Sequence, residues 1–360
     1  MRRGGRRDGL TMKILYVGPD SGTSRQRKFA LERLGHDLFL VDPFEALPLR
    51  RWTRPWSFKT GALGLEGLVR RYVLAKVGEA RFDLVLVDGG ELIGAALTRD
   101  LRQAAAAIVH FNLDNPFVDR DGARWRLVRR AMPFYDLFVS PRDSTNQAAL
   151  RAGVKHTLRI DQAADEIGSR RLDFSAQDHV RYDADVVFVG VWMPERGPFM
   201  ARLIERGVPL RIYGPRWEKS AEYSRIEPYI AGGWVADEAY AKAIQGGKIA
   251  IGMLSKGNED LHTTRTMEVP AMGVLLCAER TSDHMRLYRD GVEAVFWDDA
   301  DECADQCLAL LADPGRLKAI AEAGHRRVIE NQAFNEPLMA RVIEAALASA
   351  STAGQGAKNV

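Results

Sequence analysis

The segment "DADVVFVGV" (183–191) decides the fold that this sequence predicts. It is a short apolar run containing a glycine near its end, and it follows a polar stretch, 161–183, with the composition of a linker. A run of the same kind, "MKILYVG" (12–18), stands near the start of the chain. Buried strands of parallel sheets read as short, continuous apolar runs. The strand pattern therefore begins twice, which predicts two domains.

Further apolar runs follow each start and alternate with helical stretches. Such alternation indicates βαβ units and a parallel sheet. Before the polar stretch we expect strands at 12–18, 37–42, 82–88, 106–111, 135–140 and 156–160, with helices near 23–34, 62–79 and 93–106. After it we expect strands at 183–191, 208–214, 247–254, 273–278 and 294–297. The sequence thus predicts an α/β fold of two doubly wound, Rossmann-like domains.

The length of 360 residues is sufficient for two cores of ordinary size. Ligands bind at the carboxyl ends of strands in open α/β sheets, so two domains with facing strand ends predict a central cleft. We expect a disordered basic tail at 1–11, a first domain at 12–170, a second domain at 171–334, a C-terminal helix at 335–350 that packs back on the first domain, and a disordered tail at 351–360.

Charge is divided unevenly along the chain. Residues 1–160 hold 28 Lys and Arg against 17 Asp and Glu, whereas residues 161–360 hold 23 against 31. This asymmetry suggests domains that face different partners.

Three cysteines cannot form a disulfide framework, and no run of eighteen apolar residues is present. We expect structural cysteines and a cytoplasmic location, with peripheral association at the inner face of the membrane as an alternative.

The segment "DLHTTRTMEVPAMG" (260–273) predicts a short helix that begins at Thr263 or Thr264. The exposed N–H groups at the start of such a helix form an anion site. His262 and Arg265 could add charged donors to this site. The segment therefore indicates a place for a phosphate or diphosphate.

One turn further into this helix, Glu268 could accept two hydrogen bonds from a vicinal diol such as a ribose. A phosphate at the tip and a ribose one turn inward describe a nucleotide diphosphate. The alternative is a surface ion pair between Arg265 and Glu268, which is common at this spacing.

Loops after the other strands of the second domain supply further candidates for donor binding. "VGVWMPERGPF" contains Gly190 and Arg196, "YGPRW" contains Tyr213 and Gly214, and Lys256 precedes the 260–273 segment. Glycine is favoured where a backbone turns sharply or approaches a ligand. The first loop of the chain, with Gly18 and Gly22, does not fit the G-x-G-x-x-G dinucleotide pattern.

Metal binding is not expected. The acidic D-x-D pattern occurs at 183–185 and 299–301. The first precedes a predicted strand instead of following one, and the second has the composition of a helix cap with acids in the first turn.

An acceptor hydroxyl would need a base within hydrogen-bond reach. Asp114, in "HFNLDNPF", is the preferred catalytic candidate because it follows a buried strand; the others are Asp20, Asp88, Glu91 and His110. The basic segments of this half, 49–56, 69–72 and 120–132, favour an anionic acceptor or an anionic membrane, with solvated surface as the alternative. In the last segment Arg126, Arg129, Arg130 and Trp125 are expected near one face. No nucleic-acid motif accompanies the charge.

The C-terminal half resembles the glycosyltransferase domain of CgeB-like, spore-maturation proteins, within the GT-B glycosyltransferases. The matching segments are "VVFVGVW…ERGPFM", "LRIYGPRW", "DLHTTRTMEVPAMGVLLCAE" and "YRDGVEAVFWDDADECADQCLALLADPGRLKAIAEAGHRRV". A looser similarity covers "MKILYVG", "FDLVLVDGGELI", "IVHFNLDNPF" and "YDLFVSPRDSTNQAALRAGV" in the N-terminal half.

This resemblance implies a GT-B fold, a nucleotide diphosphate sugar bound by the C-terminal domain and an acceptor bound by the N-terminal domain. It also implies that Glu268 binds the ribose. Related retaining enzymes have a second glutamate in an E-x7-E pattern, and Asp260 stands at that position here. Asp260 is therefore a further catalytic candidate, together with Arg265. A nucleotide-sugar epimerase and an inactive nucleotide- or sugar-binding protein are the alternatives.

Overall fold

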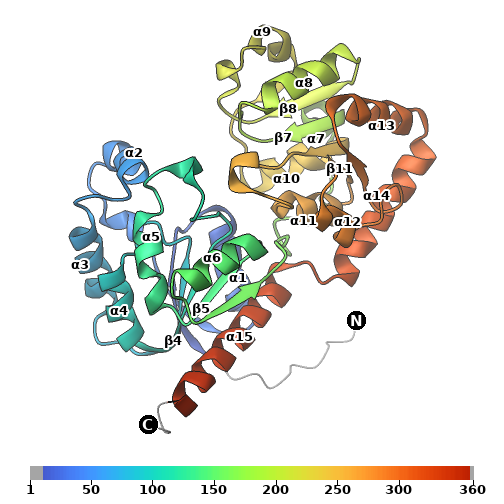
Figure 1. The fold of residues 1–360 in the computed structure, drawn as a ribbon. Coiled ribbons are helices and arrows are strands. Elements are labelled where there is room, and N and C mark those ends of the chain that lie inside the picture. The colour runs from blue at the N-terminus through green and yellow to red at the C-terminus, as the bar shows by residue number, and fades with distance from the viewer. Residues whose placement is uncertain (1–10, 357–360) are drawn as a thin grey trace. The chain divides into compact units, whose positions relative to one another are not determined.

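The computed structural model of the chain describes residues 11–356, which form two compact units. The first unit comprises the chain up to Ile160 together with the residues from Glu336 onward, and the second unit is Asp161–Asn335. In each unit helices flank a six-stranded sheet (Figure 1). Within residues 11–356, every helix is too short or too polar to cross a lipid bilayer.

The sheet of the first unit is parallel throughout, with the strand order β2-β1-β3-β4-β5-β6. The chain runs outward from β1 to β2 and then returns past β1 to β3, so the strand order reverses between β1 and β3. Ligands bind at such a reversal, outside the carboxyl ends of the strands. The strands are β1 (Lys13–Val17), β2 (Asp37–Val41), β3 (Phe82–Asp88), β4 (Ala105–Phe111), β5 (Leu137–Ser140) and β6 (His156–Arg159).

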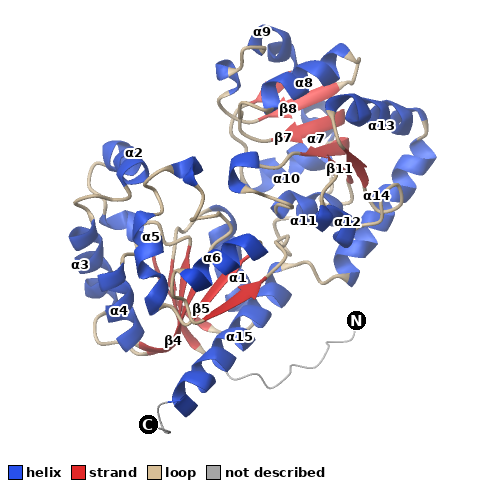
Figure 2. Ribbon diagram, viewed as in Figure 1, coloured by secondary structure: helices blue, strands red, loops and turns tan. Residues whose placement is uncertain are grey.

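Helices cover both faces of this sheet, as Figure 2 shows, and this explains why its central strands are almost continuously apolar and buried. The helices of the first unit are α1 (Gly22–Arg33), α2 (Arg50–Thr60), α3 (Glu66–Val77), α4 (Ala95–Gln103), α5 (Arg126–Ala131), α6 (Asp143–Arg151) and α15 (Asn335–Gly356), the last from Glu336 onward.

The sheet of the second unit is also parallel, with the order β12-β11-β10-β7-β8-β9. Its order reverses between β7 and β10, which are hydrogen-bonded neighbours. The strands are β7 (Ala184–Val189), β8 (Leu210–Tyr213), β9 (Ile230–Gly232), β10 (Gly247–Gly252), β11 (Leu275–Glu279) and β12 (Val295–Trp297). The helices are α7 (Ala176–Tyr182), α8 (Arg196–Glu205), α9 (Tyr223–Ile226), α10 (Asp237–Gln245), α11 (Thr264–Ala271), α12 (Ser282–Leu287), α13 (Ala300–Ala312) and α14 (Pro314–Glu330).

Two doubly wound α/β sheets were expected, and this fold class is confirmed. The border between the units differs from the expected one, because it follows Ile160 and not residue 170. Residues after Ile160 are bound to the second unit: the N–H of Gln162 donates to His262 Nε2 at 3.0 Å, and Arg286 pairs with Asp161. The predicted linker also contains α7.

The last helix, α15, is longer than the sequence predicted. We expected it to end at residue 350, and it runs to Gly356. Near its start, Arg33 of α1 pairs with Glu336, with 2.5 Å between Nε and Oε1. Residues 1–10 and 357–360, which belong to the predicted tails, lie outside the described residues.

The elements that the sequence did not predict are β9, α2, α5, α6 and α7. Strand β9 has three residues and includes Gly232, so it has no apolar run to recognise. Helix α2 contains Pro55, and Ser57 is its one buried residue, so it lacks the buried apolar face that helical periodicity detects.

A buried ion pair stands at the strand reversal of the first unit. Arg27 of α1 donates from Nη2 to Asp88 Oδ2 at 2.8 Å and from Nε at 3.0 Å, and Tyr16 donates to the same oxygen at 2.5 Å. The guanidinium also stacks on Phe111, 4.7 Å from the ring centre. A buried charge needs such partners, and here they join β1, β3 and α1 beside a cavity.

Candidate active site

The candidate donor site of the second unit lies at the carboxyl ends of β7 and β10. Gly190 and Gly214 follow β7 and β8, and their backbones touch. A Cβ atom on Gly214 would lie 2.0 Å from the carbonyl oxygen of Gly190, and Gly214 has φ +142°. A Cβ on Gly190 would meet Phe188 at 2.7 Å and Arg196 Nη1 at 3.2 Å. Glycine is therefore required at both positions by the close approach of two chain segments.

Arg196, the first residue of α8, connects the ends of β7 and β10. Its side chain is buried, with 3% of the residue exposed. Nη1 donates to the carbonyl of Val191 at 2.8 Å, and Nη2 donates to that of Met253 at 3.4 Å. Its Nε is buried and has no hydrogen-bond partner in the part of the chain that the structure describes.

A second guanidinium faces Arg196. Burial first, and then the charge of Arg265, lower the pKa of Arg196 to about 10. Arg265 is half-buried on the first turn of α11, and its Nε also lacks a hydrogen-bond partner among the described residues. Within residues 11–356, neither guanidinium forms an ion pair with a carboxylate. Two guanidinium groups with unpaired Nε donors, one buried and one half-buried, are suited to binding an anion.

Glu268 lies one turn further along α11 and is buried, with 5% exposed. Tyr240 of α10 donates to its Oε2 at 2.6 Å. Burial raises the pKa of Glu268, while the hydrogen bond from Tyr240 and the charge of Arg265 oppose that rise. A solvent-facing Arg265–Glu268 pair was the alternative expectation, and the burial of Glu268 contradicts it.

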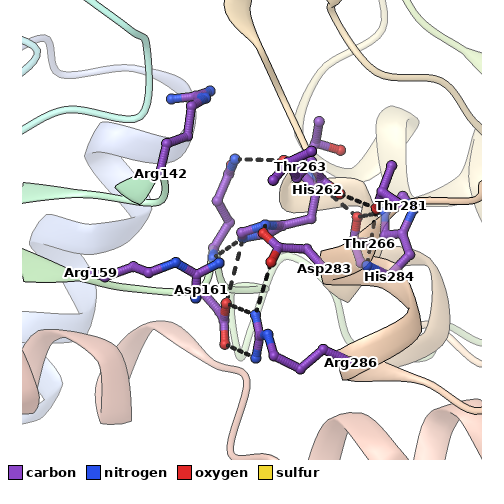
Figure 3. Close-up of polar contacts among 12 residues, drawn as sticks. Arg142, Arg159, Asp161, His262, Thr263, Thr266, Thr281, Asp283, His284 and Arg286 are labelled. Atoms are coloured by element: carbon purple, nitrogen blue, oxygen red, sulfur yellow. Dashed lines mark hydrogen bonds and ion pairs between the residues drawn. The ribbon is translucent and has the colours of Figure 1, made fainter. Parts of the chain in front are cut away.

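His262 is placed differently from our expectation. Its side chain is 1% exposed, Nδ1 donates to Asp283 Oδ2 at 2.7 Å, and Nε2 accepts the N–H of Gln162 at 3.0 Å. Both ring nitrogens are therefore used, as Figure 3 shows together with the Asp161–Arg286 pair. His262 fixes the segment after Ile160 to the start of α11 and is not free to bind a diphosphate.

The remaining predicted donor residues surround α11. Thr263 precedes the helix, its N–H donates to Thr266 Oγ1 at 3.1 Å, and Thr264 is the first helical residue. Lys256 is exposed and pairs with Glu279. Asp260 is half-buried and accepts from Asn258 Nδ2 at 2.8 Å.

Tyr213, the last predicted donor residue, ends β8. It is buried, and its hydroxyl has no hydrogen-bond partner among the described residues.

The sequence did not identify His284 as part of this region. His284 Nδ1 donates to the carbonyl of Glu279, and Nε2 accepts from the hydroxyl of Thr266 at 2.9 Å (Figure 3). Burial lowers the pKa of His284 to about 4, so the ring is neutral. The segment "TSDHM" after β11 contains both Asp283 and His284. Its position after the carboxyl end of a predicted strand could have identified these residues as part of the site.

The first unit contains a cavity of about 620 Å³ at its own strand reversal. It lies at the carboxyl ends of β1, β3 and β4. Charged and aromatic side chains line much of it; its lining includes Arg27, Phe44, Arg54, Phe58, Asp88, Glu91, Asp114 and Arg124. This cavity is the candidate acceptor site.

Asp114 lines this cavity, as a catalytic candidate should. Its side chain is 37% exposed, and Arg124 Nη1 lies 3.4 Å from Oδ2. Arg124 also binds Glu91 at 2.6 Å and Asp121 at 3.2 Å. One guanidinium thus pairs with three carboxylates, two of which, Glu91 and Asp114, line the cavity.

The other base candidates have structural partners. Asp88 is held by Arg27 and Tyr16, and Asp20 pairs with Arg25 on the surface. Burial lowers the pKa of His110 to about 4. A neutral His110 donates from Nε2 to the carbonyl of Gly89, with 3.1 Å between them.

Only some side chains of the basic segment 120–132 are exposed to solvent. Arg126 and Arg129 donate to the carbonyls of Gly61 and Pro116, and Trp125 is 1% exposed. The expected exposed cluster around Trp125 is therefore wrong, because this indole belongs to the core.

The cysteines lie closer together than their spacing indicated. The Sγ atoms of Cys277, Cys303 and Cys307 all lie within 4.8 Å of one another, in the apolar core of the second unit. Sequence reasoning missed the proximity of Cys277 because it comes from β11, whereas the other two share α13.

Part of the chain matches a known protein family. Residues 196–340 match the family model for glycosyl transferase-like proteins, which covers α8 through the first residues of α15. No curated protein matches the chain. The matched segment includes Arg196, Arg265 and Glu268.

Solved structures similar to the chain cover nearly all of it. Sucrose-phosphate synthase from Thermosynechococcus elongatus has a TM-score of 0.68 and 16% identity, over 94% of this chain and 99% of that one. The HepE protein of Anabaena in complex with UDP-glucose has a TM-score of 0.63 and 14% identity, over 93% and 100%. Trehalose 6-phosphate synthase from Burkholderia multivorans has a TM-score of 0.60 and 13% identity, over 94% and 100%. These similarities show that the chain has the GT-B fold.

We predict that the second unit loses stability as the pH falls from about 6.5 toward 4. His284 is neutral when folded and protonates near pH 6.5 when unfolded, so the unfolded state binds more protons in this window. The contribution of His284 is fully present above pH 6.5 and amounts to about 3 kcal/mol, at about 1.4 kcal/mol per pH unit.

Calorimetric unfolding of the full chain at several pH values measures this effect. His284→Gln should flatten the pH dependence of the second unit, whatever it does to stability at neutral pH. His156→Gln, at an exposed position, should leave the dependence as it is. An equally steep dependence in His284→Gln would contradict the prediction.

Proposed function

We propose that this protein is a glycosyltransferase that takes a sugar from a nucleotide diphosphate sugar. The observation that carries the proposal is the pair Arg196 and Arg265, two adjacent guanidinium groups whose buried Nε atoms have no hydrogen-bond partner among the described residues. They stand at the strand reversal of a GT-B unit that matches the glycosyl transferase-like family. A diphosphate satisfies these donors and separates the two charges.

The donor lies along α11 in this proposal. The diphosphate binds Arg196, Arg265 and the N–H groups of Thr263 and Thr264 at the helix tip. Glu268, one turn inward, accepts the ribose hydroxyls, and Tyr240 holds its carboxylate in place. The complex of HepE with UDP-glucose supports a uridine diphosphate sugar as the first donor to test.

Arg265 and Arg196 would act on the leaving group. Negative charge grows on the diphosphate as the glycosidic bond breaks, and fixed cations stabilise that charge without reorganisation. Lys256, exposed and paired with Glu279, adds a further cation at the edge of the site. Asp260 is the acidic candidate beside the donor, and Asp114 is the candidate base for the acceptor.

The first unit would hold the acceptor in its 620 Å³ cavity. Arg27 and Arg124 of the lining are paired with carboxylates, so an anionic acceptor would depend on Arg54. Peripheral contact of this basic unit with an anionic membrane belongs to the same proposal. We also propose that the chain belongs with the CgeB-like glycosyltransferases, on the resemblance of the segments quoted above.

No metal is needed in this proposal. Asp299 accepts the N–H of Glu302 at 2.9 Å as the cap of α13, and Asp301 pairs with Arg202 at 2.8 Å. In the other D-x-D segment, Asp185 pairs with Lys248 at 2.6 Å. These carboxylates already have partners from the protein.

We predict that Arg265→Ala lowers kcat about 100-fold with a smaller effect on the KM of the donor. Loss of one preorganised donor to a developing anion has effects of this size. Hydrolysis of UDP-sugars measures it without an identified acceptor. Arg225→Ala removes an exposed arginine that pairs with Glu205 and should keep parental activity. Equal rates for both variants would contradict the role of Arg265.

We predict that Glu268→Gln weakens UDP binding about tenfold or more, because the amide replaces one carboxylate acceptor with a donor. Gln is chosen since Glu268 is buried and Ala would leave the Tyr240 hydroxyl unpaired. Titration calorimetry with UDP measures the affinity. Glu322→Gln, a carboxylate that pairs with Arg171 on the surface, is the matched control. An unchanged Kd in Glu268→Gln would refute ribose binding.

We predict that sugar transfer or donor hydrolysis continues in excess EDTA. The helix tip and two arginines neutralise the departing diphosphate without a cation. The double variant Asp299→Ala, Asp301→Ala should remain active at a temperature well below unfolding, although it loses a helix cap. Abolition by EDTA and recovery with manganese would overturn the metal-independent mechanism.

A further inference from the structure

Helix α2 of the first unit exposes large apolar side chains to solvent. Of its eleven residues, Ser57 is the one that is buried. Leu49, Trp52, Trp56 and Leu63 are 78%, 71%, 51% and 57% exposed. We call these four side chains, with the cations Arg50, Arg51, Arg54 and Lys59 between them, the α2 patch.

The apolar members of the α2 patch lie together. Trp52 and Trp56 are one turn apart on α2, and Leu49 stands three residues before Trp52, so the three share one side of the helix. The indole Nε1 of Trp56 donates to the carbonyl of Leu63 at 3.0 Å, which brings the following loop beside them. A soluble fold gains nothing from exposing two tryptophans and two leucines side by side, so the patch indicates an interaction surface.

The charge of the patch identifies the partner. Residues 46–65 contain four Arg and Lys and no Asp or Glu. Arg51 lies 5.8 Å from the ring centre of Trp52, so cation and indole share the same surface. A second copy of this chain would bring like charges together. Tryptophan and leucine flanked by arginine and lysine suit the boundary between headgroups and acyl chains of an anionic bilayer.

The cavity of the first unit begins at the same helix. Arg54 and Phe58, both on α2, line it, and Phe44 lies beside Arg54 with 5.0 Å between guanidinium and ring centre. An element that rests on a bilayer would therefore also form a wall of the cavity.

We infer that the α2 patch docks the protein on the surface of an anionic lipid bilayer, with Trp52 and Trp56 inserted among the headgroups (α2 in Figure 1). It follows that the cavity receives its acceptor from that bilayer, a step that rests on the proposed transfer reaction. The docking itself does not depend on the activity.

Sedimentation of the full chain with vesicles tests the docking. The protein should sediment with vesicles made of a mixture of phosphatidylglycerol and phosphatidylcholine. It should not sediment with vesicles made only of phosphatidylcholine. Trp52→Ser with Trp56→Ser should reduce partitioning about tenfold or more. Arg50→Gln with Arg51→Gln should remove the preference for phosphatidylglycerol and the sensitivity to salt. Trp234→Ser, at a 78% exposed tryptophan of the second unit, is the matched control and should bind as the parent does.

Unchanged thermal midpoints confirm that the variants are folded. Titration of the same variants with UDP shows whether donor binding is intact, so a loss of docking can be distinguished from a loss of donor binding. Quenching of tryptophan fluorescence by brominated lipid should occur in the parent and decline in the Trp52, Trp56 variant. Absence of binding to phosphatidylglycerol vesicles, or equal binding by this variant, would overturn the inference. Self-association that disappears in this variant, without vesicle binding, would assign the patch to a second copy.

Discussion

The guanidinium of Arg196 is the interaction on which the second unit depends. A doubly wound sheet sends its connections in opposite directions at β7 and β10, so the backbone carbonyls that follow these strands have no neighbouring strand to pair with. Arg196 donates to one carbonyl after each strand and closes the gap between the two diverging loops. The contact of Gly190 with Gly214 holds the third loop close to it. The position of the site therefore follows from the strand order.

Placing a buried cation there has an energetic cost, and a second arginine increases it. Burial and then the charge of Arg265 lower the pKa of Arg196 to about 10, because both disfavour its charged form. An anion between the guanidinium groups removes that penalty. Binding of the diphosphate should then stabilise the second unit as well as the loops around it.

The sequence predicted the strands and helices that a local pattern of apolar residues identifies. It did not predict the burial and the partners of side chains that depend on residues far away in the chain. Eleven of the twelve strands that the structure describes were predicted from their apolar runs, whereas β9 and α2 lack such a run. For the site, "DLHTTRTMEVPAMG" located α11 correctly, but the role of His262 depends on Asp283, twenty-one residues away, and on Gln162, a hundred residues away. The burial of Glu268 likewise depends on Tyr240 of α10. The type of a side chain shows which ligands it could bind. Only the folded structure shows whether its polar atoms are already bonded to other residues of the protein.

The two histidines of the α11 region illustrate this rule and define the electrostatics of the site. His262 accepts an N–H at Nε2, and His284 accepts a hydroxyl there, so both rings are occupied as neutral hydrogen-bond partners. The positive charge at the helix tip consequently comes from arginine, whose charge persists throughout the physiological pH range. Histidine in this site supports the backbone that presents the arginines. Stabilisation of a leaving group at this tip therefore rests on arginine and on backbone N–H groups, and the histidines act only through the positions that they fix.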